Sequence, residues 1–139
     1  MDPSEARARF AAARVARLAT AGADGRPHLV PVVFAVDGDT VYTAVDDVKP
    51  KATMRLRRLA NIAANPAVAL LADHYDEDWT ALWWARADGT ARLLEPGDDD
   101  AAGARALLAE RYAQYRDAPP PGVVIAADVT RWSGWAAGG

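Results

Sequence analysis

The chain has 139 residues, of which 51% are hydrophobic and 25% charged, and its formal net charge is −3. This length suits a single domain over residues 1–139 that buries a core without disulfides. No apolar run approaches the roughly 18 to 20 residues that span a bilayer, and the N-terminal segment lacks the apolar stretch of a signal peptide. We therefore expect a cytoplasmic protein with no membrane partner.

The cysteine, histidine and charge counts narrow the chemistry. The absence of cysteine excludes disulfides, thiolate zinc sites and a cysteine nucleophile. His28 and His74 are too few for most metal clusters, although a site made by His74 with Asp76 or Asp78 is conceivable. The preferred prediction is no metal. The negative net charge also argues against a broad nucleic-acid-binding surface.

The first half of the chain predicts one helix and three strands. Residues 4–14 form a short helix with Ser4 as a plausible N-cap. The sequences "GADGR" and "VDGDT" contain the Asp-Gly pairs of hairpin turns, and they separate strands near 15–21, 27–37 and 40–46. The middle strand is apolar on both faces, which predicts cover on two sides. Pro31 lacks an N–H, so it should lie at a sheet edge or a bulge.

The second half predicts two helices and three strands. A helix over 52–65 has an apolar stripe (Leu56, Leu59, Ala60 and Ala63) and ends before Pro66, whereas a helix over 96–117 has the stripe Ala101, Ala104, Leu108, Tyr112 and Tyr115. The expected strands cover 67–76, 79–95 with a bulge near "ADG", and 123–137 after a rigid "APPPG" connector. This order indicates a mainly β protein, a small antiparallel barrel with flanking helices.

The stretch "DHYDEDWTALWW" at 73–84 places acidic residues before three tryptophans. The acidic residues are typical of a solvated turn. Read as a strand, the next residues put Trp79 and Trp83 on one face and Trp84 on the other. Aromatic side chains on both faces favour a strand that packs inward on the core and outward on a partner subunit.

The segment "DDVKPKATMRLRR" holds Lys49 and Lys51, the two lysines of the chain, just before a predicted helix. Flexible ammonium groups beside a helix N-terminus bind phosphate well. Arg55 and Arg58 extend the positive charge along the helix. Two interpretations stay open from these residues: a pocket for a phosphorylated ligand, or a solvated basic helix face.

The order of these features resembles a known superfamily. The most specific parts are Tyr42-Thr43 at a strand end, the lysine-bearing segment, and a helix that ends at Asn65-Pro66 before an apolar strand. Over roughly residues 10 to 135 the sequence resembles the flavin- and deazaflavin-dependent oxidoreductases of the split β-barrel superfamily, which includes the pyridoxamine 5′-phosphate oxidases. The "DW..LWW.R..G.A" pattern is most similar to the branch that uses coenzyme F-420.

The resemblance implies a homodimer of split β-barrels in which both subunits form the cofactor groove. It implies that Lys49, Lys51 and Thr43 hold the phosphate and that Arg55 and Arg58 meet the carboxylate tail. The ring system would lie beside Pro31, Val32 and Val33. From the strand pattern, Trp79 or Trp83 is a candidate for a wall of the groove. Flavin oxidases of the group usually carry an arginine and a lysine on the second strand, whereas this chain has "PHLVPVVF" there, which favours F-420 over FMN.

The implied activity is hydride transfer between reduced coenzyme F-420 and a small organic substrate, in a site that needs an apolar groove more than a catalytic triad. His28, Tyr42 or solvent would supply the proton, and Arg131 and Trp132 are candidates to complete the neighbouring subunit's site. An FMN-dependent oxidase or reductase is the nearest alternative. A carrier or sensor without catalysis, and a heme protein with His28 or His74 as axial ligand, are further alternatives.

Overall fold

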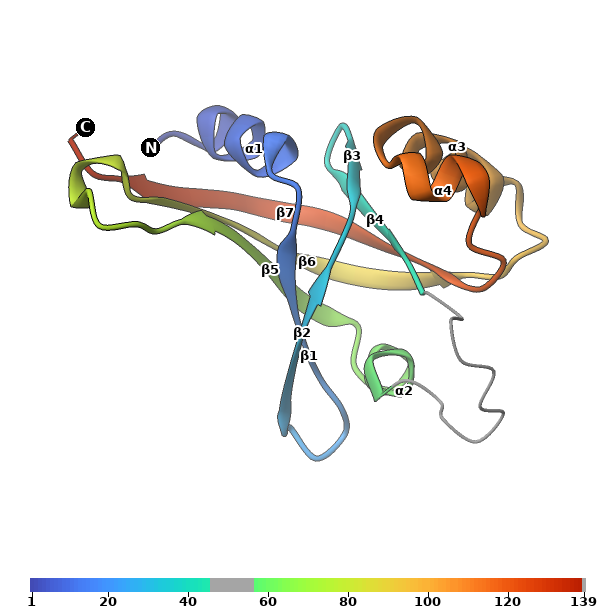
Figure 1. Cartoon of the computed structure of the whole chain (residues 1–139). Helices are drawn as coiled ribbons and strands as arrows, with labels where there is room; N and C mark the ends of the chain where they lie inside the picture. Colours follow the sequence, from blue (N-terminus) through green and yellow to red (C-terminus); the bar gives the residue numbers. More distant parts are fainter. Residues whose placement is uncertain (46–56, 139) are drawn as a thin grey trace.

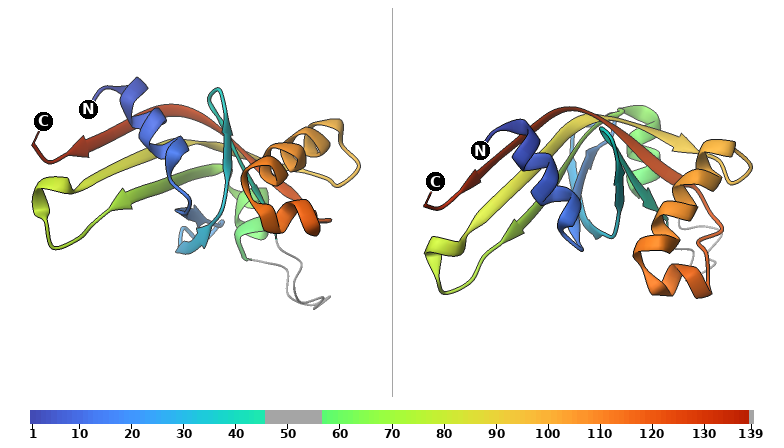
Figure 2. Two further views of the ribbon diagram at one scale, coloured as in Figure 1. Left: turned by 45° about the horizontal axis from the view of Figure 1, so that its top comes forward. Right: turned by 90° about the horizontal axis from the view of Figure 1, so that it is seen from above.

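A computed structural model describes residues 1–45 and 57–138 of the chain. A seven-stranded antiparallel sheet dominates these residues, with the strand order β2-β1-β5-β6-β7-β4-β3. Helices lie against the sheet, and the two chain ends lie at the same end of it (Figures 1 and 2). The predicted fold class, mainly β with flanking helices, is confirmed.

The first half of the chain follows the predicted order of elements: α1 (Pro3–Ala12), β1 (Ala16–Ala21), β2 (Pro27–Val32), β3 (Ala35–Asp37) and β4 (Thr40–Ala44). Asp2, and not Ser4, is the N-cap of α1, because its carboxylate accepts a hydrogen bond from the Glu5 N–H. Gly25 and Gly38 occupy the two hairpin turns with φ of 74° and 60°. Glycine adopts these angles without steric cost, as the Asp-Gly pairs predict.

The single strand predicted over 27–37 is two strands in the structure. The chain bends at Val33 and Phe34, where the Phe34 N–H donates to the Tyr112 hydroxyl oxygen and not to a neighbouring strand. Pro31 lies on an edge strand, as predicted, because β2 pairs only with β1 among the described residues. Within the described residues of this one chain Leu29 is 66% exposed, so the predicted cover on the second face does not come from them.

The second half contains α2 (Arg57–Ala64), β5 (Ala67–His74), the 3-10 turn η1 (Trp79–Ala81), β6 (Trp83–Leu94), α3 (Asp99–Arg111), α4 (Ala113–Asp117) and β7 (Val124–Ala136). The strand predicted from Trp79 starts four residues later, because Asp78 accepts hydrogen bonds from the Thr80 backbone and hydroxyl and so closes a turn. The helix predicted over 96–117 is interrupted at Tyr112, whose backbone is extended.

Helix α2 buries a different face from the one its apolar stripe predicts. Ala60 and Ala63 are exposed, whereas Asn61 and Ile62 are buried. The Asn61 side chain donates to the Thr20 hydroxyl at 3.0 Å, so a buried polar pair joins α2 to β1. This bond explains why an amide faces the core.

The predicted bulge is present where β6 meets β7. The register shifts between Asp88, opposite Arg131, and Gly89, opposite Val129. Thr130 of β7 is therefore the extra residue. A Cβ atom on Gly89 would overlap the Asp128 carbonyl oxygen, which accounts for glycine at this position.

The sheet is open, in contrast to the predicted barrel. Its two edges are β2 and β3, which follow each other in the chain but are not paired among the described residues. Pro27 and Pro31 on β2 lack the N–H groups that a further strand would need. The bend at Val33 and Phe34 thus separates the edges and does not join them.

Two apolar clusters hold the helices on the sheet. Phe10 of α1 is fully buried, with its ring centroid 4.7 Å from that of Phe34 and 5.4 Å from that of Trp132. Helices α3 and α4 pack at the end of the sheet formed by β3, β4 and β7 (Figure 2). Their buried residues are Ala101, Ala104, Leu108 and Tyr115, with Tyr112 packed against them, which confirms the predicted stripe.

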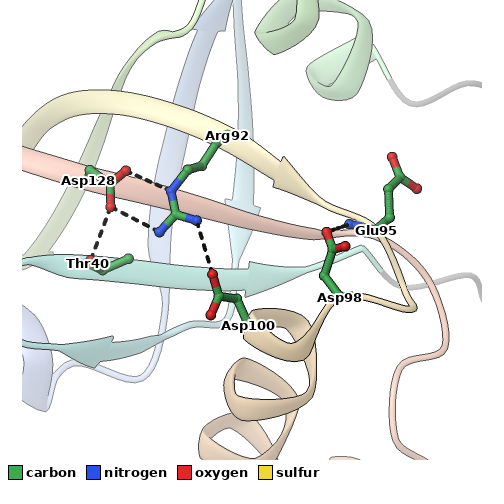
Figure 3. A network of polar contacts seen from close by, with 6 residues as sticks. All are labelled: Thr40, Arg92, Glu95, Asp98, Asp100 and Asp128. Carbon is green, nitrogen blue, oxygen red and sulfur yellow. Dashed lines mark hydrogen bonds and ion pairs between the residues drawn. The ribbon is translucent and has the colours of Figure 1, made fainter.

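A charged group links β4, β6, β7 and α3 (Figure 3). The Arg92 guanidinium donates to Asp128 at 2.9 and 3.4 Å, and Asp128 also accepts from the Thr40 hydroxyl at 3.2 Å. Asp100 of α3 lies 3.8 Å from Arg92. The hydrogen bond from Arg92 lowers the pKa of the Asp128 carboxyl and raises that of Arg92.

No helix among residues 1–45 and 57–138 is long and apolar enough to cross a membrane.

Candidate functional site at the bend between β2 and β3

A cavity of about 240 Å³ opens where β2 ends, and five parts of the fold border it: the start of β1, the end of β2, β4, α2 and α4. Its lining consists of Val15, Pro31, Val32, Val33, Thr43, Ala44, Arg58 and Tyr115. Most of these side chains are apolar, and Arg58 of α2 is the cation among them. Such a mixture suits a ligand that has an apolar body and an anionic group.

The bend that forms one wall is fixed by Tyr112, at the junction of α3 and α4. Its hydroxyl oxygen accepts from the Phe34 N–H at 3.1 Å. It also lies 2.9 Å from the Phe34 carbonyl oxygen and 3.0 Å from that of Arg14, and it donates its single proton to one of them. The hydroxyl therefore satisfies backbone groups that the break in the strand leaves without sheet partners.

Two arginines brace the same region. Arg14 donates to the Arg111 carbonyl oxygen at 3.0 Å, and Arg111 donates to the carbonyl oxygen of Ala13. The Arg14 guanidinium lies 4.7 Å from the Tyr112 ring centroid, and that of Arg111 lies 4.9 Å from the Phe34 ring centroid. Burial lowers the pKa of the Arg111 guanidinium, which stays charged because the ordinary pKa of arginine is so high. The approach to β1 and the bend after β2 are thus tied together.

Five of the residues predicted to bind the cofactor line this cavity: Pro31, Val32, Val33, Thr43 and Arg58. Thr43 is buried, and its hydroxyl donates to the Val33 carbonyl oxygen at 2.8 Å. In this arrangement the Thr43 oxygen is left as an acceptor, so donation to a phosphate would require exchange of that bond. Lys49, Lys51 and Arg55 lie outside the described residues.

Trp79 is not part of the cavity lining. It lies in the turn between β5 and β6, which is at the end of the sheet away from α3 and α4 (Figures 1 and 2), and it is 76% exposed. Trp79 therefore does not line the cavity of its own chain, and its predicted role in a groove shared by two subunits stays a prediction. Trp132 belongs to the core of its own chain, because it is buried and its Nε1 donates to Asp39 at 2.9 Å.

The polar candidates for other chemistry lie apart from the cavity. Neither His28 nor Tyr42 is among its lining residues. His74 is exposed in the β5 to β6 hairpin, where its Nε2 lies 2.7 Å from Asp76 Oδ2. Within the described ranges no three histidine, aspartate or glutamate side chains come together in a way that could hold a metal ion.

Sequence reasoning missed three lining residues: Val15, Ala44 and Tyr115. Ala44 could have been found, because it follows Thr43 in the motif. Tyr115 belongs to the predicted apolar stripe of 96–117, but the break at Tyr112 that orients α4 has no plain sequence signal. Val15 precedes β1 and carries no pattern that points to a site.

The family model described as pyridoxamine 5′-phosphate oxidase matches residues 3–136, nearly the whole chain. The chain belongs to the pyridoxamine 5′-phosphate oxidase family. No curated protein sequence matches it significantly.

Solved structures show the same fold at low sequence identity. The conserved hypothetical protein Rv2991 from Mycobacterium tuberculosis has a TM-score of 0.73 and 21% identity, covering 98% of this chain and 85% of that protein. An FAD-binding protein from Mesorhizobium loti has a TM-score of 0.71 and 21% identity, covering 96% and 94%. HutZ, the heme storage protein from Vibrio cholerae, has a TM-score of 0.73 and 17% identity, covering 98% and 95%. At these identities the likeness establishes the fold alone.

The cavity fits some of the groups that this family suggests better than others. Apolar walls beside a guanidinium match a flavin or deazaflavin, which combines a planar ring system with a phosphate. No histidine is among the residues that line the cavity, so a heme there would need another axial ligand, such as the phenolate of Tyr115.

Proposed function

We propose that the protein is a homodimeric coenzyme F-420-dependent oxidoreductase that reduces a small organic substrate. The observation that carries this proposal is the cavity at the bend after β2, where Pro31, Val32 and Val33 lie together with Arg58. The sequence of β2 supports the deazaflavin over FMN, because residues Pro27–Val32 include neither arginine nor lysine.

When bound, a deazaflavin supplies a hydride for two-electron reduction. The residues of this chain hold the ring and keep water away, which favours transfer over a short, fixed distance. Arg58 offers charge to an anionic group, and Lys49, Lys51 and Arg55 are proposed to add to it. Pro31, Val32 and Val33 form the apolar wall, and the Tyr112 hydroxyl positions that wall through Phe34.

The proposed dimer is supported by apolar surface that the described residues leave uncovered. Leu29, Tyr75 and Trp79 are 66%, 64% and 76% exposed, and Trp135 is 45% exposed. Large apolar side chains this open are typical of protein interfaces when they are contiguous. In such a dimer Trp79 and Arg131 would line the cavity of the partner subunit, and not the cavity of their own chain.

An FMN-dependent oxidase or reductase is the second candidate. It is favoured by the FAD-binding proteins among the similar structures and by the apolar walls, which suit either ring. A carrier that binds the coenzyme without turnover uses the same cavity. Heme is a third ligand to test, because the heme storage protein HutZ has a similar fold.

The test is a parallel titration of purified protein with F-420, FMN and heme, followed by fluorescence for the first two and by the Soret band for heme. We expect micromolar binding of F-420, weaker binding of FMN and no shift of the Soret band. Binding of heme alone would refute the proposal. Substrate-dependent oxidation of reduced F-420 then separates an enzyme from a carrier, and persistent failure over many acceptors would favour the carrier.

A further inference from the structure

The side chain of Arg17, on β1, carries a positive charge that the described residues do not neutralise. Arg17 lies in the middle of β1 and is exposed. None of the hydrogen bonds, ion pairs or ring contacts among residues 1–45 and 57–138 involves its side chain. In the sheet it lies directly opposite Pro31 on one side and Leu71 on the other, so its immediate cross-strand neighbours are apolar.

Arg86, a second arginine in the same cross-strand row, does have polar and aromatic partners, in contrast to Arg17. Arg86 lies opposite Leu71 on β6. Its Nε donates to Asp88 at 2.9 Å, and its guanidinium lies 5.6 Å from the Trp84 ring centroid. Asp73, two residues beyond Leu71 on β5, makes no ion pair with Arg17 within the described ranges. Within residues 1–45 and 57–138, this face thus compensates Arg86 and gives Arg17 no anionic partner.

The position of Arg17 puts that charge beside the cavity. Directly opposite residues of antiparallel strands have Cα atoms about 5 Å apart and side chains on the same face. Pro31, the residue opposite Arg17, lines the cavity, and so does Val15, two residues before Arg17. The arginine side chain is long and flexible, so its guanidinium can reach past the proline ring to the cavity mouth.

We propose that Arg17 is a specificity-determining residue that binds an anionic group of the ligand, a phosphate or a carboxylate, at the mouth of the cavity. This inference rests on the proposed function and adds to it a second cation, on β1, separate from Arg58 on α2. The cavity then selects ligands whose apolar ring carries negative charge within reach of the edge strand, and it discriminates against neutral analogues.

The experiment compares Arg17→Gln with Arg26→Gln, a matched control. Arg26 is exposed on the same hairpin, and its side chain makes no hydrogen bond, ion pair or ring contact within the described residues. It lies five residues from Pro31, or about 16 Å along a strand. Dissociation constants are measured for F-420 and FMN, and for two neutral counterparts, riboflavin and the deazaflavin ring without phosphate and tail. Melting temperatures check that each variant folds, and Arg17→Lys tests rescue by charge.

We expect Arg17→Gln to weaken binding of the charged ligands by about three- to tenfold, the range of an exposed to a partly shielded charged contact. The neutral ligands should bind as they do to the wild type, Arg26→Gln should have no effect, and Arg17→Lys should recover most of the affinity. Added salt should narrow the difference between wild type and Arg17→Gln.

Two results would overturn the inference while the proposed function stands: unchanged affinity of Arg17→Gln for F-420 and FMN, or equal weakening of neutral and charged ligands. If the wild type bound neither F-420 nor FMN, the proposed function would fail first and the role of Arg17 with it. If Arg17→Gln failed to fold, the Arg17→Lys variant decides, because loss of affinity there with an unchanged melting temperature contradicts a charge contact.

Discussion

At the scale of single residues, Asp39 connects the acid stability of the protein to its core. The Asp39 carboxylate accepts hydrogen bonds from Trp132 Nε1 at 2.9 Å and from Arg7 at 3.2 Å. These bonds, chiefly the one from Trp132, lower the pKa of the carboxyl below its ordinary value. A lowered pKa stabilises the fold above the unfolded-state value, about 3.9, and this contribution is lost as the pH falls through the folded-state value.

We therefore predict that Asp39→Asn flattens the dependence of the melting temperature on pH below about pH 4. The variant keeps an acceptor for Trp132 but has no proton to gain. Asp78 and Asp128 also have lowered pKa values, so part of the acid sensitivity should remain. Identical slopes for Asp39→Asn and the wild type would disprove the coupling.

At the scale of secondary structure elements, the bend between β2 and β3 depends on one hydroxyl from the α3 to α4 junction. Tyr112→Phe removes the acceptor of the Phe34 N–H and the single donor to the carbonyl oxygen of either Phe34 or Arg14. We expect the free energy of unfolding to fall by about 1 to 3 kcal/mol, because a partly buried N–H is left unsatisfied.

The same variant should weaken coenzyme binding, since Val33 precedes the released Phe34 and forms part of the cavity wall. Chemical denaturation measures the first effect, and fluorescence titration with F-420 and FMN measures the second. Tyr75→Phe is a suitable control, because Tyr75 is 64% exposed in the β5 to β6 hairpin. A Tyr112→Phe protein with wild-type stability would show that the hydroxyl does not hold the bend.

At the scale of the whole molecule, the uncovered apolar side chains predict a homodimer in solution. We expect size-exclusion chromatography with light scattering to give about twice the chain mass of 14.8 kDa. Leu29→Lys places a charge at an exposed apolar position of the edge strand and should shift the population towards monomer. A wild-type protein that stays monomeric at micromolar concentration would contradict this prediction.

Much of the fold could be predicted from the sequence because its signals are local. Asp-Gly pairs fix the hairpin turns, the stripe from Ala101 to Tyr115 fixes a buried helix face, and Pro31 identifies an edge strand. The errors arise where a long-range contact overrides a local pattern. The bend at Phe34 depends on Tyr112, 78 residues away, and the buried face of α2 depends on the bond from Asn61 to Thr20.

The residues of the candidate site also divide into those that a sequence motif predicts and those that only long-range packing places there. Pro31, Val32, Val33, Thr43 and Arg58 were identified from a resemblance to a family, and the fold brings them to one cavity. Tyr115 and Val15 were missed because their place in the lining comes from how α4 and the start of β1 pack, which no short motif encodes. The predicted strand start at Trp79 is wrong because a turn at Asp78 replaces the first part of that strand.

The most direct test of the central claim, that this cavity holds the coenzyme, compares two adjacent arginines of α2. Arg58 lines the cavity, whereas Arg57 is exposed and does not. The dissociation constant of F-420 is measured for the wild type, Arg58→Gln and Arg57→Gln at low salt. We predict that Arg58→Gln weakens binding by about tenfold, as expected for loss of a charged hydrogen bond, while Arg57→Gln binds like the wild type. Equal affinities in all three proteins would contradict the claim.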